Sequence, residues 1–149
     1  MTWHLVDFAT LSATELYDVM RLRQEVFVVE QDCVYLDADG YDAVARHLLG
    51  RDADGTLVAY LRLFAPGVKY TEACIGRVCT AAAVRGTGLG QALMQRGIAE
   101  AARLWPESAL RISAQAYLLN FYDKLGFVAE GELYDEDGIP HIEMVRKSC

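Results

Sequence analysis

The residues best suited to chemistry are three glycines at positions 86, 88 and 90, which follow Arg85. Glycine lets the main chain adopt positive φ and approach a ligand closely. The stretch lies where an apolar segment gives way to a helical pattern, and the free N–H groups and dipole of a helix start favour negative charge. The turn is therefore predicted to hold a phosphate group, with Arg85 as a positive side chain at its mouth.

The spacing of these glycines separates the common phosphate-binding turns. A dinucleotide fingerprint that began at Gly86 would need its third glycine at position 91, which is Gln91. A nucleoside triphosphate loop would need a Gly-Lys pair, and none follows these glycines. Two interpretations stay open: an R-x-x-G-x-G turn that holds another phosphate-bearing ligand, and a glycine-rich connection between strand and helix that holds none.

Length and composition are those of one globular domain over residues 1–149. Hydrophobic side chains make up 53% of the chain and charged ones 23%, which is typical of a folded protein. The formal net charge of −7 argues against nucleic-acid binding, and no apolar run approaches the ~18 residues that cross a membrane. The first residues lack the pattern of a secretory signal, so we expect a cytoplasmic protein.

The cysteines do not form a recognisable metal or redox motif. They have no C-x-x-C pair and no histidines at zinc spacing, so we interpret all four as reduced structural thiols and expect no metal. Cys74 and Cys79 are five positions apart and would face opposite sides of a regular strand. The cysteines are Cys33, Cys74, Cys79 and Cys149.

An aspartate-rich segment lies between Asp32 and Asp42, with four aspartates. Their order does not match an EF-hand, so we interpret the segment as an acidic loop in solvent. Two arginines on predicted strands, Arg62 and Arg77, either bind an acidic acceptor or pair with carboxylates of the chain itself.

The hydrophobic patterns predict an α/β domain, or α+β in some schemes, with a mixed central sheet of about six to seven strands flanked by helices. Ser12 and Glu15 form a capping box, from which a helix should run to about Val28. The strand at 57–64 should turn one aliphatic face to a core. The helix at 89–105 should pack through a stripe of Met94, Ile98, Ala101, Ala102 and Trp105. The other predicted strands are 3–8, 44–50, 74–80, 110–115, 127–133 and 141–145, and a short helix covers 117–125.

A second motif follows downstream, where residues 121–127 have the pattern F-Y-x-x-x-G-F. Alone it is typical of an amphipathic helix with a glycine cap. Together with the glycine turn it resembles the GNAT superfamily of acetyl-CoA-dependent N-acyltransferases, in which the turn is the pyrophosphate loop. Further matches resemble the small bacterial ElaA-like branch and cover nearly the whole chain in order. These matches are 27–31, 46–47, 75–78, 105–106, 114–116 and 136–141.

The resemblance implies that acetyl-CoA donates its acetyl group directly to an amine, without a metal. The pantetheine arm would pair with the backbone of the strand that ends at Thr80, and Tyr122 would donate a proton to the leaving sulfur. Gln115 stands where many members carry an asparagine. The cofactor-binding residues expected from the family are Val78, Cys79, Thr80, Arg85, Gly86, Thr87, Gly88, Leu89, Gly90, Gln115 and Tyr122.

The general base has several candidates, because an alkyl ammonium must lose a proton before it attacks a thioester. Glu30 and His47 belong to the branch-specific matches and are the first candidates for a base or for the acceptor site. A lone histidine in a strand is alternatively a hydrogen-bonded structural residue. The remaining candidates are Glu72, Glu143 and His141.

Two other functions stay open: a catalytically silent CoA-binding or sensing module, and an interaction domain whose glycines only shape a connection. The acceptor would be a small-molecule or peptide amine that the sequence does not identify. GNAT proteins are often dimers, which leaves a homodimer open.

Overall fold

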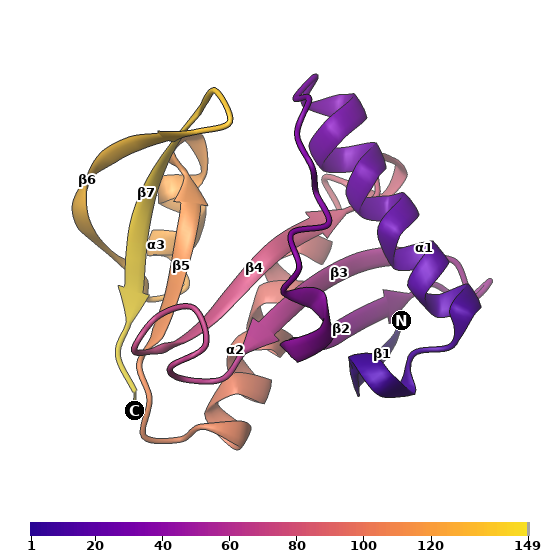
Figure 1. The fold of residues 1–149 in the computed structure, drawn as a ribbon, viewed down its shortest axis with the longest axis horizontal. Helices are drawn as coiled ribbons and strands as arrows, with labels where there is room; N and C mark the ends of the chain where they lie inside the picture. Colours follow the sequence, from indigo (N-terminus) through magenta and orange to yellow (C-terminus); the bar gives the residue numbers. More distant parts are fainter. Residues whose placement is uncertain (149) are drawn as a thin grey trace.

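The computed structural model describes residues 1–148, and its centre is a seven-stranded sheet in the order β1-β2-β3-β4-β5-β7-β6 (Figure 1). Only β4 and β5 are parallel neighbours, so the sheet is mixed, as the sequence predicted. The strands are β1 (Thr2–Asp7), β2 (Arg46–Arg51), β3 (Leu57–Phe64), β4 (Ala73–Thr80), β5 (Leu110–Gln115), β6 (Val128–Glu136) and β7 (Ile139–Arg146).

The first helix, α1 (Ala13–Arg23), starts at the predicted capping box. The Glu15 N–H donates to the Ser12 hydroxyl at 3.0 Å, and the Ser12 N–H donates to the Glu15 carboxylate at 2.9 Å. The α-helix does not reach Val28, because the chain continues as a wider π-helical segment, η2 (Gln24–Glu30). The segment contains Val26, Val28 and Val29, whose β-branched side chains lower the propensity for a regular α-helix.

The second helix, α2 (Leu89–Leu104), packs on the other face of the sheet from α1. The α1 residue Val19 shares a core with Tyr60 of β3, whereas the α2 residue Leu93 shares one with Leu61. Neighbouring strand residues point to opposite faces, so both faces of β3 are buried rather than the one expected.

The buried stripe of α2 differs from the predicted one. Met94 and Ala101 are buried as expected, but Ala102 is exposed. Gly97 takes part instead, since a Cβ at this position would lie 2.7 Å from a methyl group of Leu61. The third helix, α3 (Leu119–Asp123), is short and ends near Gly126 at φ +91°.

The sheet opens between β4 and β5, which pair over only three residues, from Ala73 to Ile75 on the β4 side. Figure 1 shows the two strands diverging beyond this point. A bulge in β4 accompanies the opening: Tyr60 of β3 pairs with Cys79, but Arg62 pairs with Gly76, so β4 carries one extra residue. Within the bulge, Arg77 adopts φ +51°.

The bulge also overturns the expected orientation of two cysteines. Cys74 pairs with Phe64 and Cys79 with Tyr60, two β3 residues on the same face of the sheet, so the cysteines share that face as well. Cys33, Cys74 and Cys79 are buried free thiols, as predicted, and Cys149 lies outside the described residues. Burial raises the pKa of Cys79 to about 12, which suppresses its thiolate.

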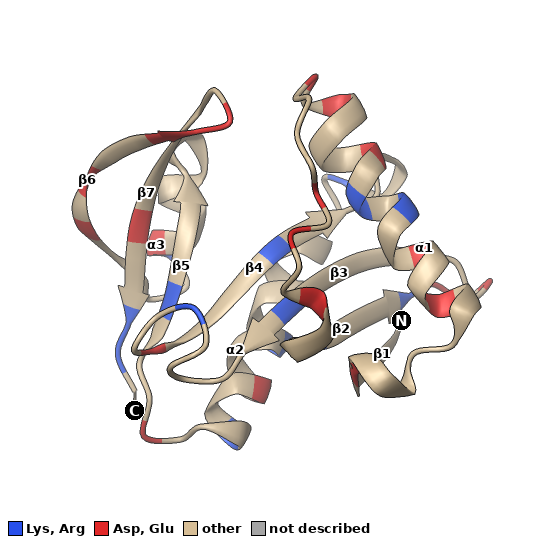
Figure 2. Cartoon of the chain, viewed as in Figure 1, with Lys and Arg blue, Asp and Glu red and all other residues tan. Residues whose placement is uncertain are grey.

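A closed ring of three arginines and three aspartates holds the bulge, and Figure 2 shows these charges where the aspartate-rich loop crosses β3 and β4. The nitrogen–oxygen distances lie between 2.5 and 3.4 Å, and the three positive charges balance the three negative ones. Nε of Arg77 lies 2.9 Å from a carboxylate oxygen of Asp37, but the two atoms do not have hydrogen-bond geometry. The ring runs from Arg23 through Asp37, Arg77, Asp39, Arg62 and Asp42 back to Arg23.

The expectation of a solvated acidic loop is therefore wrong for three of its four aspartates, since Asp37 and Asp42 are buried and Asp39 is half-buried. Guanidinium groups from α1, β3 and β4 converge on the loop and replace the water that the carboxylates would otherwise bind. Arg62 and Arg77 thus pair with carboxylates of their own chain.

Replacing Asp42 by asparagine should destabilise the protein strongly. It removes a carboxylate from Arg23 and Arg62, both fully buried, and leaves positive charge without compensation. We expect a loss of about 3–5 kcal/mol in the free energy of unfolding, measured with urea. Asp7→Asn is the control, because it breaks only an exposed pair with Arg46 and should cost less than about 1 kcal/mol. Equal losses would contradict the structural role of the ring.

Acid should weaken the fold through the same ring. Burial by itself raises the pKa of Asp39 and Asp42, but hydrogen bonds from Arg62 to Asp39 and from Arg23 to Asp42 outweigh it and lower both values. Carboxyls with a lowered folded pKa stabilise the protein above their unfolded pKa, near 4, and lose this effect as the pH falls further. Urea unfolding should show a decline in the free energy of unfolding below about pH 4, and this decline should be smaller in Asp42→Asn. A decline of the same size in both proteins would count against the ring as its cause.

Candidate active site

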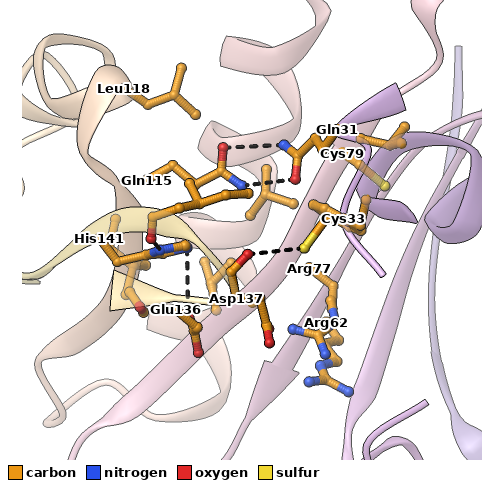
Figure 3. A pocket seen from close by; sticks show the side chains of 18 of the residues that line it. Gln31, Cys33, Arg62, Arg77, Cys79, Gln115, Leu118, Glu136, Asp137 and His141 are labelled. Atoms are coloured by element: carbon orange, nitrogen blue, oxygen red, sulfur yellow. Dashed lines mark hydrogen bonds and ion pairs between the residues drawn. The ribbon is translucent and has the colours of Figure 1, made fainter. Parts of the chain in front are cut away.

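A cavity of about 880 Å³ lies where β4 and β5 diverge. Its walls come from η2 and the aspartate-rich loop on one side, from β3, β4 and the glycine turn at the back, and from β5, α3 and the β6–β7 turn on the other side. Figure 3 shows side chains from both sides meeting across it. The volume is in the range of small-molecule and cofactor sites.

The glycine turn has the geometry of an anion site. Gly86 and Gly88 have φ values of +80° and +83°, and no atom lies within 4 Å of a Cβ built on either. Gly88 is the N-cap of α2 and no side chain caps the helix, so its first N–H groups are open to a ligand. The Thr87 hydroxyl donates to the Val84 carbonyl and shapes the turn.

Arg85 connects this turn with the opposite wall. Its guanidinium donates to the Thr80 carbonyl at 2.9 Å and forms an ion pair with Glu30 at the end of η2. Glu30 does line the cavity, but its carboxylate is engaged by Arg85. This pair places Glu30 beside the turn where an anion would bind.

Strand β4 offers a free edge to the cavity. Val78, Cys79 and Thr80 line it, and the β4–β5 register ends at Ile75, so none of the three has a β5 partner within the described residues. An extended ligand with amide groups could add to this edge as another strand would.

Tyr122 reaches the same cavity from α3 and is only 6% exposed. Phe121 and Phe127 hold its ring edge-on, at centroid distances of 5.1 and 6.0 Å. Burial raises the pKa of Tyr122 to about 12, so the hydroxyl stays protonated and can donate a hydrogen bond.

Two contacts cross the cavity, as Figure 3 shows. Gln31 and Gln115 exchange amide hydrogen bonds of 3.2 and 3.3 Å, and the Cys33 thiol donates to the Asp137 carbonyl at 3.2 Å. Gln31 and Cys33 were absent from the predicted site. Gln31 did occur in one family match, but only the fold reveals that it faces Gln115.

His47 does not belong to this cavity. Its ring is fully buried, with Nδ1 2.6 Å from the Tyr60 hydroxyl and Nε2 2.9 Å from the Asp42 carbonyl. Burial lowers the pKa of His47 and favours the neutral ring. The prediction of His47 as a base or acceptor-site residue is therefore wrong, and the structural alternative holds. Glu72 and Glu143 do not line the cavity either, and both form ion pairs with Arg111.

His141 does line the cavity, from β7. Its Nδ1 lies 2.7 Å from the Ile139 carbonyl oxygen and its Nε2 3.3 Å from a carboxylate oxygen of Glu136. The structure thus brings several predicted site residues to one cavity, while residues 86–88 lie in the exposed turn beside it and Leu89, the half-buried first residue of α2, is outside the lining. The predicted residues that line the cavity are Glu30, Val78, Cys79, Thr80, Arg85, Gly90, Gln115, Tyr122 and His141.

Two features are missing from residues 1–148, the part of the chain that the structure describes. No group of three or more His, Cys, Asp or Glu side chains is arranged to hold a metal ion. None of the helices in residues 1–148 is long and apolar enough to cross a membrane.

Comparison with known proteins agrees with this geometry. Residues 25–148 match the family described as the acetyltransferase (GNAT) domain. A UPF0039 protein of Synechocystis is 46% identical and the ElaA protein of Escherichia coli 42% identical, and each match covers 97% of this chain and at least 94% of the relative.

Solved structures give the same result. The crystal structure of an acyl-CoA N-acyltransferase from Pseudomonas aeruginosa is 47% identical, with a TM-score of 0.93 over 97% of this chain and 98% of that one. The crystal structure of E. coli ElaA is 41% identical, with a TM-score of 0.91 over 98% and 99% of the two chains. The chain therefore belongs to the GNAT acetyltransferase family, within the branch that includes ElaA.

Proposed function

We propose that this protein is an acetyl-CoA-dependent N-acetyltransferase that transfers an acetyl group directly to an amine. The observation that carries the proposal is that the free edge of β4 and Tyr122 line one cavity and that the open glycine turn lies beside it. Each feature suits a different part of acetyl-CoA: the turn suits the pyrophosphate, the β4 edge suits the amide-containing arm, and Tyr122 suits the thioester.

The donor fits these features by its chemistry. Pyrophosphate oxygens accept hydrogen bonds, and the first N–H groups of α2 together with the Arg85 guanidinium donate them. The pantetheine amides are suited to the backbone groups of β4 from Val78 to Thr80. A main-chain N–H on this edge would stabilise the negative charge that develops on the thioester oxygen during attack.

Tyr122 supplies the hydrogen bond to the leaving sulfur in this proposal. Its pKa of about 12 lies well above the ~8.5 of a thiol, so complete transfer of its proton to the thiolate would be uphill. The hydroxyl therefore acts mainly as a donor to the sulfur as the carbon–sulfur bond breaks, and the proton that the attacking amine loses completes the thiol.

Acetyl-CoA should bind and stabilise the protein. At a concentration of 100 times Kd, the expected gain is about 2.7 kcal/mol in the free energy of unfolding, seen as a thermal shift. Arg85→Ala should raise Kd about tenfold, in line with one lost charge-assisted hydrogen bond. Arg103→Ala is the control, because Arg103 is exposed on α2 and pairs only with Glu100.

The absence of a thermal shift at millimolar acetyl-CoA would contradict both an acetyltransferase and a CoA-binding sensor. Release of free thiol across a panel of small amines, polyamines, amino acids and peptides separates these two. Thiol release that requires an amine supports the enzyme. Binding without release from any member of the panel supports the silent module.

Replacing Tyr122 by phenylalanine should lower kcat at least about 100-fold and leave Kd for acetyl-CoA nearly unchanged. The substitution removes the hydroxyl but keeps the ring between Phe121 and Phe127. Turnover is followed by thiol release with the best amine of the panel. Tyr17→Phe, at an exposed position of α1, is the matched control. Full turnover in Tyr122→Phe would remove the tyrosine from the mechanism.

A further inference from the structure

We propose that His141 is the general base that deprotonates the acceptor amine, and that Glu136 lies beside its ring as a counter-ion. This inference rests on the proposed function, because only attack by an amine requires a base. It also separates the five candidates that the sequence left open. Glu30 is engaged by Arg85, His47 is buried away from the cavity, and Glu72 and Glu143 hold Arg111 elsewhere.

The hydrogen bonds of His141 fix where its proton lies. The Ile139 carbonyl, 2.7 Å from Nδ1, can only accept a hydrogen bond, so the neutral ring carries its proton on Nδ1. The lone pair is then on Nε2, the nitrogen that a base uses, and the contact of Nε2 with Glu136 is not a hydrogen bond. When Nε2 takes up a proton, the Glu136 carboxylate lies 3.3 Å away as its counter-ion.

The imidazole ring also lines the cavity that Tyr122 and the edge of β4 share. His141 of β7 pairs directly with Gln115 of β5, so the two side chains share a face of the sheet at the edge of the opening (Figure 3). Tyr134 of β6 stacks on the imidazole, with ring centroids 6.0 Å apart, and its hydroxyl hydrogen-bonds to Ser113. These contacts give the imidazole one orientation, with Glu136 beside Nε2.

Among the described residues, Glu136 is the carboxylate within ion-pair distance of the His141 ring. Glu136 and Tyr134 face it from β6, and Gln115 faces it from β5. Because the Glu136 side chain is 53% exposed, the dyad can exchange protons with solvent.

The proposed reaction moves two protons from the acceptor ammonium and exchanges a carbon–sulfur bond for a carbon–nitrogen bond. The acceptor ammonium gives one proton to Nε2 of His141, and the neutral amine attacks the acetyl carbonyl carbon, so that a carbon–nitrogen bond forms. The carbon–sulfur bond then breaks, and the second amine proton passes to the sulfur, helped by the hydrogen bond from Tyr122. His141 returns the first proton to water on the Glu136 side. The products are the acetylated amine, free CoA thiol and one proton.

The position of the ring proton is tested without any acceptor. Nitrogen NMR of the 15N-histidine-labelled protein should show neutral His141 with hydrogen on Nδ1 and none on Nε2, both free and with saturating acetyl-CoA. His141→Gln identifies the signal among the three histidines of the chain. A neutral ring protonated on Nε2 would overturn the inference, because that nitrogen could not accept a proton.

Kinetics provide the second test, with the primary amine that the wild-type protein acetylates fastest in the thiol-release screen. His141→Ala should lower kcat at least about 100-fold, and added imidazole should restore part of the loss. Glu136→Gln, at a half-exposed position, should lower kcat about tenfold. Both variants should keep the wild-type Kd for acetyl-CoA, and His4→Ala, at the exposed histidine of β1, should keep full activity.

The two proposals fail in different ways. If the wild-type protein does not bind acetyl-CoA, the proposed function is wrong. If it binds acetyl-CoA and acetylates the amine, but His141→Ala retains full turnover, the function stands and His141 is not the base. Loss of activity in His141→Ala without any rescue by imidazole, in a variant whose urea unfolding is also weakened, would assign His141 a structural role instead.

Discussion

The bulge at Arg77 is the feature on which the rest of this structure depends. A regular β4 could continue its pairing with β5, and the cavity between the two strands would close. The pairing lasts for three residues, and the extra residue of β4 and the left-handed backbone of Arg77 directly follow its end. A non-glycine residue in this conformation costs about 1–3 kcal/mol. The ion pairs of Arg77 with Asp37 and Asp39 offset that cost by fixing the side chain.

The ring of charges extends this constraint to the whole amino-terminal half. The ion pairs of Arg23 and Arg62 attach α1 and β3 to the aspartate-rich loop, which forms one wall of the cavity. Buried ion pairs contribute little net stability compared with apolar packing, but each requires its partners in one place. The ring thus specifies the path of a loop that has few apolar residues to guide it.

The cavity joins two walls with different tasks in the proposed reaction. The turn before α2 and the edge of β4 suit the donor, whereas β7 carries His141 toward the acceptor. The amide pair of Gln31 and Gln115 crosses between the walls, and the Cys33 thiol makes a second crossing. Both crossings come from the segment after η2, whose wider turns set the direction in which the chain leaves the helix.

The sequence by itself determined the local features: the capping box at Ser12, the glycine turn before α2, the hydrophobic strands and the two family motifs, because each depends on neighbouring residues. It also determined the family through the order of those motifs. The tertiary structure alone decided which charges meet. The aspartates of the loop are 14 to 40 positions from the arginines that bind them, and the sequence pattern of the loop resembles any solvated acidic segment. His47 and His141 are equally plausible bases in the sequence. They differ only in their strand partners. His47 pairs with a residue of β3 in the buried centre of the sheet, whereas His141 pairs with Gln115 at the edge of the opening. Strand register between distant parts of the chain decides both positions.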